Sequence, residues 1–375
     1  MFTRRSARTL AVAAVVAAGA SLPAAAAAHS LSPRGGVVFV QTDSTAGNAV
    51  VVYDRAPNGS LSEAGTYPTG GLGGQLGGSV VDHLASEGSL TYDHAAHLLY
   101  AVNAGSNTVT VFKVCGDTLR REQIVPSGGT FPTSIAVHGN LVYVENALDG
   151  GSIQGYVRSG EQLVPVSGWN RGLGLSTTAT PQFLNAPGQI ILSPDGRQLI
   201  VSTKANGDDL DVFAIGHMGS PSATPTVNAE GTSIPFALTF DRSGDLLVAA
   251  PGTNAVMSFS LASNGTLTEL QSVATGQAAT CWIVRRGEYF YASNAGSASV
   301  SAFSDTGPGT LAALGNTATD PGTIDAAISR HGRYMYVETG MNGIVDEFAV
   351  GAAGSLTSIG SVTIPGDYGE GIVAR

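Results

Sequence analysis

Short hydrophobic segments recur along the chain, and each has the length of a β-strand rather than of a helix. Each is followed by a polar turn and a second run that ends on an aromatic residue. The segments are 37–42 (VVFVQT), 98–103 (LLYAVN), 141–146 (LVYVEN), 198–203 (QLIVST), 246–251 (LLVAAP), 289–294 (YFYASN) and 334–339 (YMYVET). The closing aromatics are Tyr53, Phe112, Tyr156, Phe213, Phe259, Phe303 and Phe348. Recurrence of this kind indicates a repeat architecture.

Two further strands complete each repeat. Asn58-Gly59 and Asn264-Gly265 supply the positive φ values that tight hairpins require, and they predict a fourth strand after each aromatic. Another strand with its own turn precedes the hydrophobic segment, as at 190–197, 237–245 and 327–333. Four short antiparallel strands in about 45 residues are typical of a β-propeller blade. We therefore predict an all-β, seven-bladed propeller.

The two ends of the propeller are predicted to meet. The first repeat has no innermost strand before Val37, whereas residues 367–375 form an innermost strand that lacks a blade. Pairing of this last strand with the first blade would close the ring and remove an open sheet edge. The alternative is a frayed tail.

The N-terminus has the features of a secretory signal peptide. Arg4, Arg5 and Arg8 precede an apolar run, and small residues follow up to position 28. We expect residues 1–28 to be removed, residues 29–375 to form one domain, and the protein to be secreted or extracytoplasmic. The arginine pair also resembles a twin-arginine export signal, although ordinary export fits equally well. No later segment is long and apolar enough to insert into a membrane.

Composition narrows the range of partners. The net charge is −10 and only 12% of residues are charged, so the basic patch that a nucleic-acid-binding protein needs is not expected. Two cysteines, Cys115 and Cys281, fall in different repeats and are predicted to be isolated thiols. The 50 glycines fit the many turns of a propeller, and the low charge fits sheets that are packed on both faces.

Residues 100–112 (YAVNAGSNTVTVF) and 291–303 (YASNAGSASVSAF) resemble the YVTN-type propeller unit. With seven blades and an export signal, the chain resembles the secreted branch of the lactonase-family propellers, which includes 6-phosphogluconolactonase and the carboxymuconate cyclases. The resemblance implies catalysis without a metal or other cofactor, by His, Arg and Glu side chains on one face. His94, His97, His138 and His331 fall in first hairpin turns and are expected to be surface turn residues.

Two connections between blades, 70–88 and 168–188, are longer than the repeat needs and are expected to surround the channel mouth. The first contains Asp82 and His83. His83 is either a functional residue or a loop histidine that bonds to the backbone. The second offers an aromatic wall and polar donors for a lactone or carbohydrate, or else packs onto the propeller: Trp169, Arg171, Gln182 and Phe183.

A second group of candidates lies where the second strands end on the same face: Gln41, Asn103, Glu145, Lys204, Asn294 and Glu338. Glu145 could act as a general base while Lys204 or Arg171 polarises a carbonyl group. Alternatively, the charged residues pair across neighbouring blades, and the asparagines close turns or hold Ca²⁺.

The sequence thus favours a secreted, monomeric lactonase-like propeller that hydrolyses or cyclises a lactone at the channel mouth without a metal. Its predicted catalytic residues are Glu145, His83 and Lys204. Its predicted ligand-binding residues are Asp82, Arg171, Gln182, Phe183, Gln41, Asn103, Asn294 and Glu338. The alternatives are a non-catalytic module that binds a glycan or surface partner, and a Ca²⁺-dependent lactonase.

Overall fold

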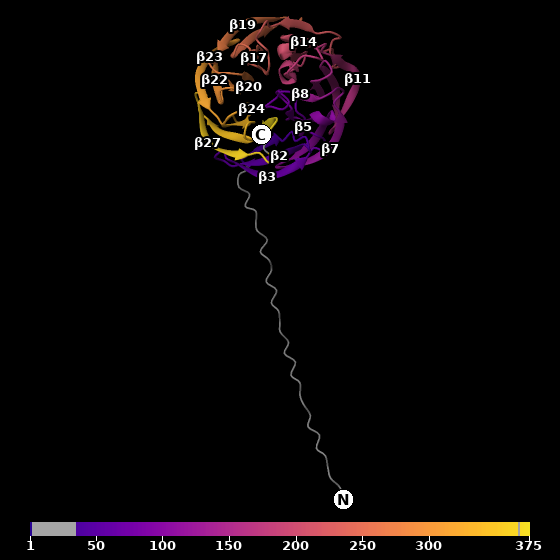
Figure 1. Cartoon of the computed structure of the whole chain (residues 1–375), viewed down its shortest axis with the longest axis vertical. Helices are drawn as coiled ribbons and strands as arrows, with labels where there is room; N and C mark the ends of the chain where they lie inside the picture. The colour runs from indigo at the N-terminus through magenta and orange to yellow at the C-terminus, as the bar shows by residue number, and fades with distance from the viewer. Residues whose placement is uncertain (2–34, 367) are drawn as a thin grey trace. The chain divides into compact units, whose positions relative to one another are not determined.

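Seven four-stranded antiparallel sheets form a closed ring. The computed structural model describes residue 1, residues 35–366 and residues 368–375. The colour in Figure 1 passes around the ring from indigo to yellow, so the first and last blades lie side by side. The seven-bladed prediction is confirmed. The predicted signal peptide lies outside the described residues.

The strands of each blade are named below in their order within the sheet, from the innermost strand at the channel to the outermost. Blade one contains β28 (Ile372–Ala374), β1 (Val37–Gln41), β2 (Ala49–Arg55) and β3 (Leu61–Pro68). Blade two contains β4 (Leu90–Asp93), β5 (Leu98–Asn103), β6 (Thr108–Cys115) and β7 (Thr118–Pro126). Blade three contains β8 (Pro132–His138), β9 (Leu141–Asn146), β10 (Ser152–Ser159) and β11 (Gln162–Gly172).

The remaining four blades repeat this order. Blade four contains β12 (Gln189–Leu192), β13 (Gln198–Ser202), β14 (Asp209–Ala214) and β15 (Thr226–Ala229). Blade five contains β16 (Leu238–Phe240), β17 (Leu246–Ala250), β18 (Ala255–Leu261) and β19 (Leu267–Ala274). Blade six contains β20 (Thr280–Arg286), β21 (Tyr289–Asn294), β22 (Ser299–Gly307) and β23 (Thr310–Ala318). Blade seven contains β24 (Thr323–Ile328), β25 (Tyr334–Thr339), β26 (Ile344–Val350) and β27 (Leu356–Thr363).

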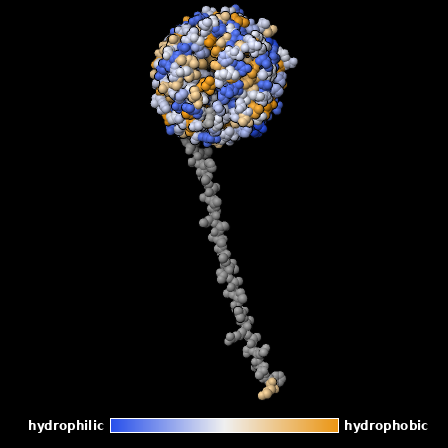
Figure 2. Space-filling model, in the orientation of Figure 1, coloured by the Kyte–Doolittle hydropathy of each residue, from blue (hydrophilic) through white to orange (hydrophobic). Residues whose placement is uncertain are grey.

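Helical structure is confined to three single turns in the described ranges: η1 (Ala104–Ser106), α1 (Gln182–Asn185) and α2 (Lys204–Gly207). None of the helices described is long and apolar enough to cross a membrane. On the face seen in Figure 2, hydrophobic residues form small separate areas among hydrophilic ones.

Because the strands of a blade are antiparallel, the ring has two distinct faces. The loop face carries the connections from one blade to the next and the turns between second and third strands. The turn face carries the turns between first and second strands and between third and fourth strands. His94, His97, His138 and His331 all lie in or beside first-to-second turns, as predicted.

Burial explains why so few residues are charged. The second strands β1, β5 and β13 are buried along their whole length, because neighbouring blades cover both faces of each sheet. The outermost strands are instead largely exposed, as β27 is. Most of the sheet area is therefore in the interior, where an unpaired charge is costly.

Tyrosine hydroxyls join neighbouring blades. Tyr336 donates a 2.7 Å hydrogen bond to the carbonyl of Gly59, and Tyr291 donates a 3.0 Å bond to the carbonyl of Gly354. Both glycines have positive φ, 97° and 78°, and a Cβ at either position would overlap an aromatic ring of the next blade. These hairpin glycines are thus required both by the turn and by the contact between blades.

The ring is closed by its C-terminal strand. β28 is antiparallel to β1, with Phe39 opposite Val373 and Val40 opposite Ile372. Arg375 and Val37 extend the pairing through their backbone groups. The predicted closure is confirmed, and it leaves the edge of β1 covered.

Two isoleucines test how much this closure stabilises the ring. Ile372 in β28 is 5% exposed, whereas Ile359 in β27 is 37% exposed. We expect Ile372→Ala to lower the free energy of unfolding by about 2–4 kcal/mol, because it leaves a cavity beside β1. Urea denaturation is the measurement, and the matched control Ile359→Ala should cost about 1 kcal/mol or less. Equal losses for the two variants would contradict this account of closure.

Candidate functional site

Loop 70–88 crosses the channel opening on the loop face. The carbonyl of Leu72 accepts a bond from Gly105 in blade two, and the carbonyl of Ser86 accepts one from the Trp282 indole in blade six. The carbonyl of Val81 packs closely against Gly340 in blade seven. Leu76 and Leu84 of the loop are fully buried. The loop therefore covers the side chains at the ends of the second strands.

Lys204 lies beneath this loop and is 1% exposed. Its Nζ donates to the carbonyls of Ala85 and Phe183 at 2.6 and 2.7 Å. Burial lowers the pKa of Lys204 to about 8, against the opposing effect of Asp82 and Glu145. Lys204 and Ala85 both have positive φ, 51° and 49°, a strained conformation for residues with a side chain. The lysine thus connects both long loops.

Glu145 and Glu338 are also fully buried. Glu145 accepts a 3.1 Å bond from the Thr133 hydroxyl, and Glu338 accepts a 3.0 Å bond from the Gly371 amide. Burial raises the pKa of Glu145 to about 8 and raises that of Glu338 well above its usual value. Neither forms the ion pair expected across neighbouring blades in the described part of the chain. Lys204 acts electrostatically on Glu145 and opposes the effect of burial on its pKa.

Sequence reasoning missed four acids that belong to the same buried region: Asp43, Glu87, Asp325 and Glu370. Asp82 and Glu370 influence each other's pKa, and so do Glu87 and Asp325. Burial is the main cause that raises the pKa of each. The sequence contains a signal for two of these acids, because Asp43 follows the second strand of blade one and Glu370 lies just before β28.

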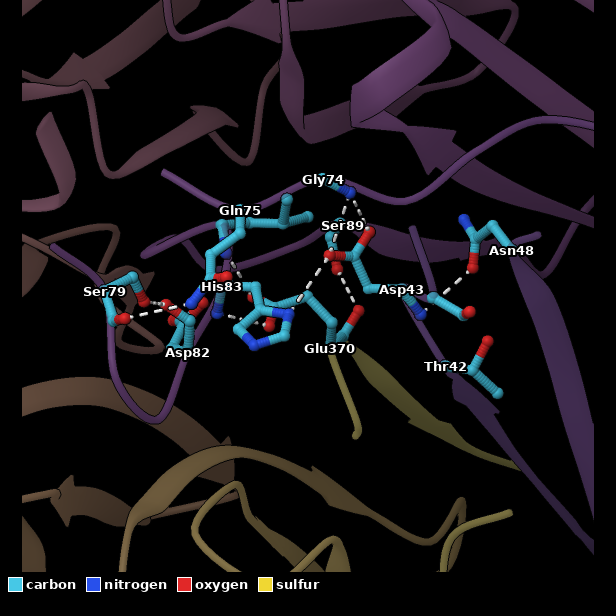
Figure 3. Close-up of polar contacts among 12 residues, drawn as sticks. Thr42, Asp43, Asn48, Gly74, Gln75, Ser79, Asp82, His83, Ser89 and Glu370 are labelled. Atoms are coloured by element: carbon cyan, nitrogen blue, oxygen red, sulfur yellow. Dashed lines mark hydrogen bonds and ion pairs between the residues drawn. The ribbon is translucent and has the colours of Figure 1, made fainter. Parts of the chain in front are cut away.

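His83 lies at the edge of this region and is 9% exposed. Its Nδ1 is 3.9 Å from Oδ2 of Asp43 (Figure 3). Its ring packs on Tyr368 with 4.5 Å between centroids. Burial lowers the pKa of His83, opposed by Asp82. The Glu370 carboxylate accepts bonds from the amides of His83 and Leu84 at 2.9 and 3.1 Å. The histidine is therefore held by residues from both ends of the chain.

Asp82 holds the loop rather than the imidazole ring. Its carboxylate accepts bonds from the amides of Ala85 and Ser86. Asp43 acts similarly, because both its oxygens lie within hydrogen-bond distance of the Gly74 amide. Loop 70–88 is thus fastened by carboxylates at several points.

The asparagines predicted to bind a ligand, Asn103 and Asn294, have a structural role. Asn103 donates to the hydroxyls of Thr108 and Thr110, and Asn294 donates to the turn at Ser299, as expected of turn-closing residues. Both amide atoms of the fully buried Gln41 have no hydrogen-bond partner. Within 35–366 and 368–375, no cluster of three or more His, Cys, Asp or Glu side chains could hold a metal ion. Cys115 and Cys281 are free thiols, as predicted.

The second long connection begins later than the sequence suggested. Trp169 and Arg171 lie in β11 and not in a loop, because this outermost strand continues to Gly172. Arg171 donates to the carbonyls of Pro221 and Ser222. Gln182 accepts a 2.8 Å bond from the Gly77 amide. The neighbouring Phe183 packs against the core of blades two and three.

The site therefore has two levels. Lys204, Glu145, Asp82 and Glu338 are brought together beneath loop 70–88, where a ligand cannot reach them in this conformation. His83 and Tyr368 form the more accessible level at the edge of the loop, and Asp43 lies buried beside His83. Arg171 is distant from both, and Gln182 and Phe183 support the loop.

The fold is a seven-bladed β-propeller with a candidate site on its loop face. The family model "Lactonase, 7-bladed beta-propeller" matches residues 173–284, which confirms the family resemblance over that segment. No curated protein sequence matches the chain.

Solved structures extend the likeness to nearly the whole fold. Pseudomonas aeruginosa periplasmic gluconolactonase is 19% identical with a TM-score of 0.72, covering 90% of this chain and 98% of that chain. A proposed 6-phosphogluconolactonase from Bacteroides fragilis is 21% identical with a TM-score of 0.71, covering 90% of this chain and 97% of that chain. At these identities the likeness establishes the fold alone.

The buried carboxyl groups predict how stability depends on pH. Glu145 binds its proton more tightly in the folded state, with a pKa of about 8, than in the unfolded chain. The folded state therefore holds more protons between about pH 4.5 and pH 8, and the free energy of unfolding should fall as pH rises through this window.

Glu145→Gln isolates one contribution to this dependence. The variant should lose the part of the decline in stability that Glu145 causes, roughly 3 kcal/mol between pH 5 and pH 8. Urea denaturation at pH 5, 6.5 and 8 is the measurement. The control Glu63→Gln, at an exposed position of β3, should keep the original pH dependence. A Glu145→Gln profile parallel to that of the unmodified protein would refute the raised pKa.

Proposed function

We propose that this protein opens lactone rings by hydrolysis at the loop face, with His83 as the general base. The observation that carries the proposal is the imidazole of His83 at the edge of loop 70–88, which is 9% exposed and lies 3.9 Å from the buried carboxyl group of Asp43. The family-model match and the folds of the gluconolactonase-type neighbours support this class of chemistry. Fold alone does not specify an activity, so the proposal depends on the site.

The imidazole suits the first step of such a reaction. Because burial lowers its pKa, His83 is neutral near pH 7 and can accept a proton. It would remove a proton from water as the water oxygen attacks the lactone carbonyl carbon. The imidazolium beside Asp43 would then return the proton to the ring oxygen as the acyl C–O bond breaks. The product is the open hydroxy acid, and no other reactant is needed.

The surroundings of His83 favour a small polar ring as the substrate. Tyr368 is 47% exposed and packs beside the imidazole, which provides an aromatic surface for a sugar-like ring. The exposed Gln75 from the same loop donates its amide to the carbonyl of Ser79 at 3.0 Å (Figure 3). We propose that a sugar lactone binds here without a metal ion, and that the chain acts outside the cytoplasm.

Lys204 and Glu145 have a different part in this proposal. Both are 1% exposed or less, so in this conformation neither touches a substrate at the edge of the loop. We assign them, with Asp82 and Glu338, to holding loop 70–88 in the position that presents His83.

Replacing the base is the direct test. His83→Gln should lower kcat for a sugar lactone by about 100-fold or more, because general-base catalysis of this kind contributes about 10²–10⁴-fold. The control is His217→Gln, which alters an exposed histidine between β14 and β15 on the turn face and should be fully active. Turnover is measured by acid release with a panel of sugar and muconate lactones. Full activity in His83→Gln, or no turnover of any lactone by the unmodified protein, would overturn the proposal.

The pH profile provides a second test. The rate should rise with pH and have its inflection below pH 6.5, the ordinary pKa of histidine. The reason is that the base must be unprotonated and burial lowers the pKa of His83. Asp43→Asn should move this inflection while leaving the fold intact. An inflection well above pH 7 in kcat/KM would point to a base other than His83.

A further inference from the structure

A hollow of about 690 Å³ lies on the turn face, at the opposite end of the blades from His83. It is bordered by the turn between β16 and β17, the end of β20, and the turn between β24 and β25. Blades five, six and seven thus each contribute one wall. The proposed hydrolysis uses no residue of this hollow.

The hollow is strongly basic in a protein whose net charge is −10. Its lining brings together four arginines and a histidine, with Glu288 as the acidic member: Arg242, Arg285, Arg286, Arg330 and His331. Arg242 lies 3.4 Å from Glu288, but both side chains are about 60% exposed, so this ion pair is weak. Positive charge therefore remains in excess.

Two of the arginines are held in place by backbone carbonyls. Arg285 donates to the carbonyls of Phe240 and Gly287 at 2.8 and 2.9 Å. Arg286 donates to the carbonyl of Gly351 at 3.1 Å and lies over the Tyr289 ring. A guanidinium has five N–H donors, so each keeps donors available for a ligand. Fixing them in advance reduces the entropy lost on binding.

The nearby acids do not neutralise this group. Asp241 and Asp305 both act electrostatically on Arg285. However, the Asp241 carboxylate accepts bonds from the amides of Ser243, Asp245 and Gly309, and Asp305 accepts one from the Gly307 amide. Among the described residues, neither carboxylate forms an ion pair with an arginine. Arg330 forms no hydrogen bond or ion pair with any residue in the described ranges, and its side chain is on an exposed turn.

We infer that this hollow binds the phosphate group of a small phosphate ester. Planar guanidinium groups match the oxygens of a phosphate, and charge-assisted bonds of this kind are among the strongest in proteins. Arg330 also acts on His94, which lines a second cavity of about 320 Å³ at the channel. The positive charge therefore extends toward the channel, where the remainder of the ester can lie. The volume suits a small molecule rather than a polymer.

Titration calorimetry with the full chain tests this inference. The probes are glucose 6-phosphate, inorganic phosphate and glucose, at low and at physiological salt. We expect saturable 1:1 binding of glucose 6-phosphate, weaker binding of inorganic phosphate, and no binding of glucose. Equal affinity for the two anions would identify free phosphate as the ligand. Added salt should weaken binding because the attraction is electrostatic.

Variants locate the site. Arg242→Gln combined with Arg330→Gln should weaken glucose 6-phosphate binding at least about tenfold, because two charge-assisted contacts are lost. The matched control is Arg197→Gln, at an 83% exposed arginine on the same face of blade four, which should bind normally. Unchanged affinity in the double variant, or no binding of either anion, would overturn the inference. His83→Gln should bind normally, so failure here and failure of the proposed hydrolysis are distinguishable.

Discussion

The pairing of β28 with β1 is the contact on which the rest of the structure depends. It joins the two ends of the chain in one sheet, and it completes the ring that lets every blade be covered on both sides. It also brings Glu370 and Tyr368 to loop 70–88, where they hold and cover His83. The proposed site therefore exists only when the ring is closed.

Closure also explains why many ionisable side chains are buried together at the centre of the loop face. The ring directs carboxyl groups from blades one, three and seven, and from the first long loop, into one dry region with Lys204 as the buried cation. Full ionisation of so many acids would be too costly at low dielectric. Burial accordingly raises the pKa of Asp82, Glu87, Asp325 and Glu370. The position of the loop is thereby linked to protonation.

Most of the fold could be predicted because its signal is periodic. The strands, hairpin turns and closing strand follow from spacing and from residues such as Gly59, whose φ a turn requires. The site could be predicted only in part. His83, Glu145 and Lys204 were placed on the correct face, but no periodic signal showed that loop 70–88 folds inward over two of them. Trp169 and Arg171 were assigned to a loop because β11 is longer than its counterparts.

The separation of the site's parts along the chain has a consequence for the order of synthesis. Glu370 follows His83 by 287 residues. A nascent chain that stops before residue 368 can form several blades, yet it lacks the carboxylate that fixes the His83 backbone. The proposed site therefore assembles only after the C-terminal part of the propeller has been made.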